Sequence, residues 1–158
     1  MPSLERQITQ TWDINNRLML FLLKELRGED LAATLSTRAG RTVGMQLAHI
    51  IDVRINWLEI CQKELLKGLT KIEREQANKK ELLIKGFEKT GKAFEKFIEH
   101  SITEHGKVKG FKNGLVPFLG YMLSHEAHHR GHILLTLKQC GIKTSDKLKW
   151  GMWDWNKI

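Results

Sequence analysis

The stretch GYMLSHEAHHRGHILLTLKQCG, residues 120–141, carries four histidines between positions 125 and 132. Each residue of an α-helix advances by about 100°, so the four side chains fall within one arc of about 100°. Apolar residues such as Met122 and Ile133 lie near the same face. Because the histidines share the apolar stripe, the pattern predicts a helix whose imidazoles point toward the interior.

The four histidines form two pairs that could each bind a metal ion. Imidazoles at positions i and i+4 stack one turn apart and can reach the same ion. Both His125 with His129 and His128 with His132 have this spacing, and spacing alone does not choose between the pairs. A third ligand has to come from elsewhere, and His49 in MQLAHIIDVRINW is the candidate. The alternative is a core histidine bonded to a carbonyl group.

The residues around His49 support a polar site. On a helix, Asp52 and Asn56 lie close to the face of His49, which otherwise carries apolar residues. Polar groups on a buried face need partners. A metal ion bound by histidines would supply one.

The segment HEAHH also matches the zinc-protease motif H-E-x-x-H. The extended protease motif requires glycine at position 132 and histidine at position 135, where this chain has His132 and Leu135. No glutamate follows Glu126 that could serve as a further ligand. The match therefore indicates metal binding and does not indicate proteolysis.

Helical periodicity extends over most of the chain and predicts an all-α fold, a four-helix bundle. Thr42 is a plausible N-cap of the second helix, and Asn78 with Glu81 resembles a capping box for the third. The glycine-rich segment 104–114 is predicted to be a loop with a short hairpin. We expect one domain, residues 1–158, with a tryptophan-rich tail over residues 142–158 that packs on the bundle or on a partner subunit. The predicted helices span residues 4–27, 43–66, 78–100 and 116–140.

Composition indicates a globular cytoplasmic protein. The chain is 41% hydrophobic and 28% charged. Its longest apolar run, residues 18–23, is far shorter than the roughly 20 residues of a membrane span. The polar N-terminus lacks the apolar stretch of a signal peptide. The two cysteines, Cys61 and Cys140, lie in apolar helical patterns, which predicts buried thiols and no disulfide.

The formal net charge of +8 raises nucleic-acid binding as an alternative function. The lysines of the predicted third helix recur at helical spacing, and Glu81 and Glu88 lie four residues before Lys85 and Lys92. Such pairs stabilise a solvated helix face. No aromatic residues alternate with these lysines to stack bases, which argues against a nucleic-acid surface.

The chain resembles the DinB/YfiT-like family over nearly its whole length. The resemblance rests on GMQLAHIIDVRINWL at residues 44–58, on the histidine-rich segment 120–141, and on the closing KWGMWDWNKI at residues 149–158. It implies a four-helix bundle in which His49, His125 and His129 bind a divalent metal ion, with Zn²⁺ and Ni²⁺ as the main candidates. Three ligands would leave a coordination position for water or substrate. Members of the family are commonly homodimers.

One position departs from the family pattern, which often has glutamine where this chain has His132. His132 is therefore a candidate fourth ligand, a partner of a ligand or a proton carrier, and His128 is a candidate partner of a ligand or a packing residue. Asp52 and Glu126 are candidates to orient a ligand imidazole or a water molecule. No catalytic residue is assigned.

The resemblance leaves three functions open. The first is a metal-dependent enzyme, such as a transferase of a small-molecule thiol, whose anionic cosubstrate a basic surface would suit. The second is a metal-dependent hydrolase. The third is a non-enzymatic metal-binding protein of the stress response. Neither a membrane nor a nucleic acid is expected as a partner.

Overall fold

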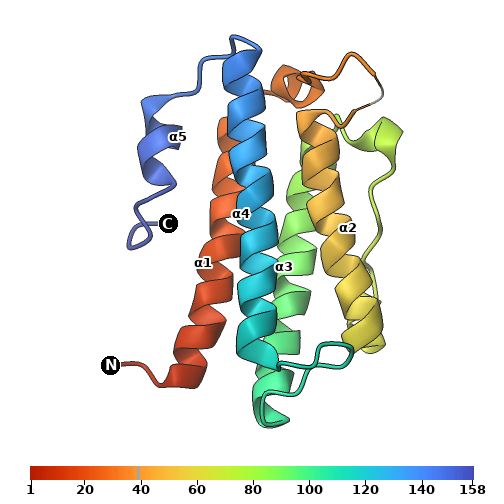
Figure 1. Ribbon diagram of the computed structural model, residues 1–158, viewed down its shortest axis with the longest axis vertical. Coiled ribbons are helices and arrows are strands. Elements are labelled where there is room, and N and C mark those ends of the chain that lie inside the picture. The colour runs from red at the N-terminus through yellow and green to blue at the C-terminus, as the bar shows by residue number, and fades with distance from the viewer. Residues whose placement is uncertain (39) are drawn as a thin grey trace.

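Four long helices lie side by side in a bundle (Figure 1). The computed structural model describes residues 1–38 and 40–158, and it has no β-strand within these residues. The predicted all-α, four-helix bundle is confirmed. The long helices are α1 (Leu4–Glu25), α2 (Val43–Cys61), α3 (Lys80–Thr103) and α4 (Leu115–Gln139). A short helix, α5 (Asp146–Gly151), follows, and 3-10 helices occur at Gly28–Ala32, Lys63–Leu66 and Arg74–Gln76.

Side chains and glycines define several helix ends. The Ser3 hydroxyl accepts a hydrogen bond from the N–H of Arg6 at the start of α1. Thr42 accepts one from the N–H of Met45 at the start of α2, as predicted. Gly114 precedes α4 with φ at 82°, a conformation that favours glycine. These ends fix the starting points of the two helices that carry His49 and the paired histidines.

Several predicted helix ends are wrong, and among them α3 ends at Thr103 and not at residue 100. Helix α2 ends at Cys61, because the backbone at Gln62 turns to φ −158° and ψ 78°, and residues 63–66 form a separate 3-10 helix. Helix α3 begins at Lys80, and Lys79 at its N-cap makes no side-chain hydrogen bond. The capping box predicted for Asn78 and Glu81 does not form.

The bundle interior contains two apolar clusters. One packs the C-terminal half of α1 against the N-terminal half of α2, and its members include Leu22, Leu47 and Ile133. The other packs aromatic side chains of α3 and α4, including Phe94 and Phe118. Arg54 is next to Ile55 of the first cluster and one turn before Leu58 of the second along α2, and its side chain is fully buried. A charged group therefore occupies the middle of the bundle.

The C-terminal tail contains α5, and this short helix packs beside α1 (Figure 1). Leu148 is buried, and Gly151 lies so close to Phe21 that an added Cβ would be 2.5 Å from the Phe21 ring. Trp150 and Trp153 are 73% and 80% exposed. The predicted packing of the tail onto the bundle is confirmed, but Leu148 makes the contact and the exposed Trp150 and Trp153 do not. Packing onto a partner subunit stays a prediction.

Both cysteines are free thiols, as predicted, but neither is buried. Cys61 is half-buried and Cys140 is exposed at the end of α4. The loop 104–114 contains an isolated antiparallel bridge between Val108 and Phe111.

Within the described residues, no helix has the length and apolar character needed to cross a membrane.

Candidate metal centre

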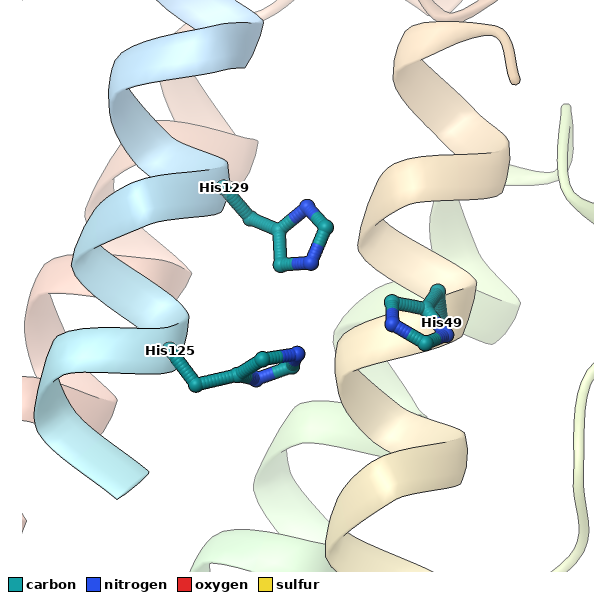
Figure 2. A group of neighbouring side chains, drawn as sticks. All are labelled: His49, His125 and His129. Atoms are coloured by element: carbon teal, nitrogen blue, oxygen red, sulfur yellow. The ribbon is translucent and has the colours of Figure 1, made fainter. Parts of the chain in front are cut away.

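Three histidines from two helices converge on one point (Figure 2). His125 and His129 extend from α4 toward α2, where His49 lies opposite them. The ring centroids of His125 and His129 are 4.7 Å apart, and the His49 ring is 5.4 Å from the first and 5.0 Å from the second. One potential ligand atom from each residue lies within 4.8 Å of the others. The three residues are those predicted from the sequence, and we call them the histidine triad.

The triad forms because α2 and α4 contact each other. The i,i+4 spacing of His125 and His129 stacks the two imidazoles on one face of α4. Buried residues on both sides of the pair, Met122 and Ile133, turn that face toward the bundle. On α2, Leu47 and Ile50 are fully buried, which leaves His49 at the edge of the core. The apolar packing of the two helices thus sets the positions of the triad.

Burial lowers the pKa of all three imidazoles. It is the main cause for His129, whose pKa falls to about 4, and the neighbouring His125 and His49 lower it further. Burial likewise lowers the pKa of His49, and Arg41 and His125 add to the effect. The pKa of His125 is lowered by burial despite the opposing charge of Glu126. The triad is therefore neutral near pH 7, the form in which imidazole binds a metal ion.

Two buried nitrogens of the triad are unsatisfied. Among the described residues, the Nδ1 atoms of His125 and His129 have no hydrogen-bond partner. A buried polar atom without a partner is costly. A bound divalent ion would remove part of this cost, since each imidazole has one nitrogen for the ion and one for a further partner. The donor set suits Zn²⁺ or Ni²⁺, so the residues present fit a divalent metal ion.

A cavity of about 380 Å³ lies beside His49. It is open to solvent and lies between α2 and the segment that contains the 3-10 helix Arg74–Gln76. Its wall carries positive charge from Arg41 and Arg74 and negative charge from Asp52 and Glu73. A small polar molecule in this cavity would lie next to one member of the triad.

The polar residues expected around the triad have different positions. Asp52 lines the cavity, and its carboxylate accepts a hydrogen bond from the N–H of Ile72. Burial raises the pKa of this carboxyl group. Asn56 is exposed, so its assignment to a buried face is wrong. His132 is outside the group of converging ligand atoms and pairs with His128 on the exposed side of α4.

Glu126 points into the bundle, where Arg54 binds it. The Nε and Nη2 atoms of Arg54 donate to its two carboxylate oxygens at 2.7 and 2.8 Å, and Asn15 donates to one of them at 2.7 Å. Arg54 also donates to Asn16 and Thr90. This network was not predicted from the sequence, although an arginine within the apolar run of α2 was a signal of a buried charge. Glu126 thus neutralises Arg54, and the expectation that it orients an imidazole or water is not supported by its contacts.

The lowered pKa of His129 predicts how the stability of the metal-free protein depends on pH. The unfolded chain binds a proton at His129 below its ordinary pKa of 6.5, whereas the folded protein resists protonation down to about pH 4. The folded state then binds fewer protons, so its free energy of unfolding falls as the pH drops from about 6.5 to about 4. Urea denaturation at several pH values would measure this.

His129→Gln should flatten the decline, because the variant loses the titrating group. His100→Gln is the matched control, since His100 is an exposed histidine of α3. Equal slopes in the wild type and His129→Gln would contradict the prediction.

Comparisons with known proteins agree with this architecture. The model of a family described as the DinB family matches residues 1–146. The crystal structure of a DinB-like protein from Bacillus cereus ATCC 10987 superposes with a TM-score of 0.65 at 19% sequence identity. The superposition covers 87% of this chain and 93% of that chain, and at this identity it shows a shared fold. The comparison with curated proteins gives no match.

Proposed function

The chain belongs to the DinB family, and on this premise we propose that it is a metal-dependent enzyme that transfers a small-molecule thiol to an electrophile. In this proposal His49, His125 and His129 hold one divalent ion, Zn²⁺ or Ni²⁺. The observation that carries the proposal is the convergence of three imidazoles, two of which have an unsatisfied buried nitrogen, beside a polar cavity.

The number of ligands favours catalysis over a purely structural role. Structural zinc sites have four protein ligands, whereas catalytic sites have three and keep a position for water or substrate. The triad supplies three imidazoles, and among the described residues no carboxylate or thiol joins the group. The cavity beside His49 would bring a cosubstrate next to that member of the triad.

The charges of the cavity suit a small polar thiol. Arg41 and Arg74 are exposed and positive, and could bind a carboxylate of the cosubstrate. Arg41 is close enough to affect the pKa of all three histidines. A carboxylate bound by Arg41 would therefore place the rest of the molecule near the triad.

The proposed reaction is a substitution at the electrophile. When bound, the metal ion would favour the thiolate form of the thiol, which is the nucleophile. The sulfur forms a bond to the electrophilic carbon, the leaving group departs with the electron pair of its bond, and the proton of the thiol passes to water. The neutral triad residues hold their positions during this step, and the arginines of the cavity orient the cosubstrate.

Thiol transfer can be measured with the zinc- or nickel-loaded protein, a thiol such as cysteine or glutathione, and chlorodinitrobenzene as the electrophile. We expect conjugate formation above the uncatalysed rate, and we expect a chelator or His129→Ala to return it to that rate. His100→Ala is the matched control and should retain the activity, because His100 is outside the converging group and exposed in the last turn of α3.

If no thiol transfer is found, further assays would distinguish a hydrolase from a non-enzymatic metal-binding protein. A protein that binds the metal but transfers no thiol would contradict the proposal. Chelator-sensitive hydrolysis of an ester would then favour a hydrolase, and the lack of both activities would favour a non-enzymatic metal-binding protein.

A further inference from the structure

A second pair of histidines lies on the exposed side of α4. His128 and His132 are one turn apart, and their ring centroids are 4.2 Å from each other, closer than any two rings of the triad. Both side chains are exposed. Neither belongs to the group of ligand atoms formed by the triad. The proposed function makes no use of this pair.

We propose that His128 and His132 form a second metal site, which binds a divalent transition-metal ion such as Ni²⁺ at the surface. The two imidazoles have the i,i+4 spacing at which neighbouring turns of a helix present side chains to one ion. Imidazole is a common ligand of Ni²⁺, Cu²⁺ and Zn²⁺. Water molecules complete the coordination, so this site binds more weakly than a site with three protein ligands.

The helix holds the pair in a fixed position. His128 and His132 lie well inside α4, which continues to Gln139 beyond them and begins at Leu115. The neighbouring side chains on α4, His129 and Ile133, are buried and fix the rotation of the helix. The two imidazoles therefore need no rearrangement of the backbone to bind an ion together.

The surface next to the pair is open. Gly131 lies between the two histidines in sequence, and a Cβ added to it would meet no atom within 4 Å. Ala127 and Ser124 are exposed small residues on the preceding turns of α4. A hydrated ion, or an ion that already carries other ligands, can therefore reach both rings. His129, in contrast, is only 8% exposed.

This difference in access gives a direct test with untagged protein on a column of immobilised Ni²⁺. The immobilised ion keeps part of its coordination sphere on the resin and can bind only exposed imidazoles. We expect the wild type to be retained and to elute with imidazole. His128→Ala and His132→Ala should each appear in the flow-through, because one exposed imidazole of the pair is lost.

Two further variants separate this site from the triad and from single surface histidines. His49→Ala breaks the triad and should still be retained, so the outcome does not depend on the proposed enzyme function. His100→Ala removes a lone exposed histidine and should also be retained. Circular dichroism would establish that each variant is folded. For His128→Ala and His132→Ala folding is expected, because both positions are exposed.

Three results would overturn the proposal. They are a wild type that is not retained, retention of His128→Ala and His132→Ala equal to that of the wild type, and loss of retention in His49→Ala. Isothermal titration of His49→Ala with Ni²⁺ should give the same answer in solution, with a weak binding event that disappears in the triple variant His49→Ala, His128→Ala, His132→Ala.

Discussion

Arg54→Ala is expected to lower the free energy of unfolding by about 3–5 kcal/mol, the range for breaking a buried ion pair by removing one partner. Arg54 and Glu126 are both fully buried. In the variant the Glu126 carboxylate would keep the hydrogen bond from Asn15 but lose both bonds from the guanidinium. The contacts of the guanidinium with the rings of Trp12 and Phe87, at 4.7 and 5.0 Å, would be lost as well.

Urea denaturation followed by circular dichroism would measure the loss. The double variant Arg54→Met, Glu126→Met distinguishes an unpaired charge from lost packing, because it removes both charges and keeps apolar volume. We expect the double variant to be much more stable than Arg54→Ala, since apolar replacements of a buried pair are often neutral or stabilising. Equal destabilisation of the two variants would assign the loss to packing instead.

An exposed ion pair provides the comparison. Lys149 and Asp146 are 3.0 Å apart on α5, with exposed side chains. Lys149→Ala should change the free energy of unfolding by no more than about 1 kcal/mol, because solvent screens such a pair. A change of the same size as that of Arg54→Ala would contradict the role given to burial.

The buried network joins all four long helices. Arg54 of α2 binds Glu126 of α4, Thr90 of α3 and Asn16 of α1. Hydrogen bonds have fixed directions, so the network favours one alignment of α2 against α4. Glu126 follows His125 directly in the sequence. The same contacts that stabilise the bundle therefore also constrain the distance between His49 and the α4 pair.

The sequence predicted the triad because its pattern lies mostly on one helix. The spacing of His125 and His129 is a local property, and the helical period alone gives the shared face. His49 was a candidate from the residues of its own helix, although no local rule says which face of α2 lies opposite α4. The choice of His125 with His129 over His128 with His132 needed the family resemblance, and His132 stayed a candidate fourth ligand. The structure brings together the three predicted residues and leaves His132 with His128.

The expectation that Glu126 orients an imidazole or a water molecule was wrong for a similar physical reason. The angle of a side chain about its own helix does not show which side chain of another helix it meets. Glu126 lies only about 100° from His125 on α4, yet it faces Arg54 in the interior. Arg54 itself lies between the apolar residues Val53 and Ile55. A buried arginine needs a buried carboxylate, so the two could have been paired by this requirement.

The residues of the tail that contact the bundle could not be predicted from the sequence. Its tryptophans suggested packing by their size, but Leu148 and Gly151 make the close contacts with the bundle. Hydrophobic residues on a short segment can face either the bundle or the solvent. Only the position of α5 beside α1 decides between them (Figure 1).

Loss of one triad histidine is expected to remove stoichiometric metal binding. Untagged protein loaded with Zn²⁺ or Ni²⁺ and then dialysed should retain about one ion per chain, since three imidazoles converge on one point. His49→Ala, His125→Ala and His129→Ala should each retain almost none, because two imidazoles with water leave a weak site. Elemental analysis by mass spectrometry would count the ions.

Thermal denaturation gives a second readout of the same prediction. A free metal concentration 100 times the dissociation constant stabilises the folded state by about 2.7 kcal/mol, which raises the Tm of a chain of this size by about 5–10 °C. The triad variants should show no such rise, whereas His100→Ala should respond like the wild type. Each triad variant must first be shown to fold, by circular dichroism in the absence of metal. Stoichiometric metal in all three folded variants would refute the triad as the binding site, because no other converging group of three such residues occurs in the part of the chain that the structure describes.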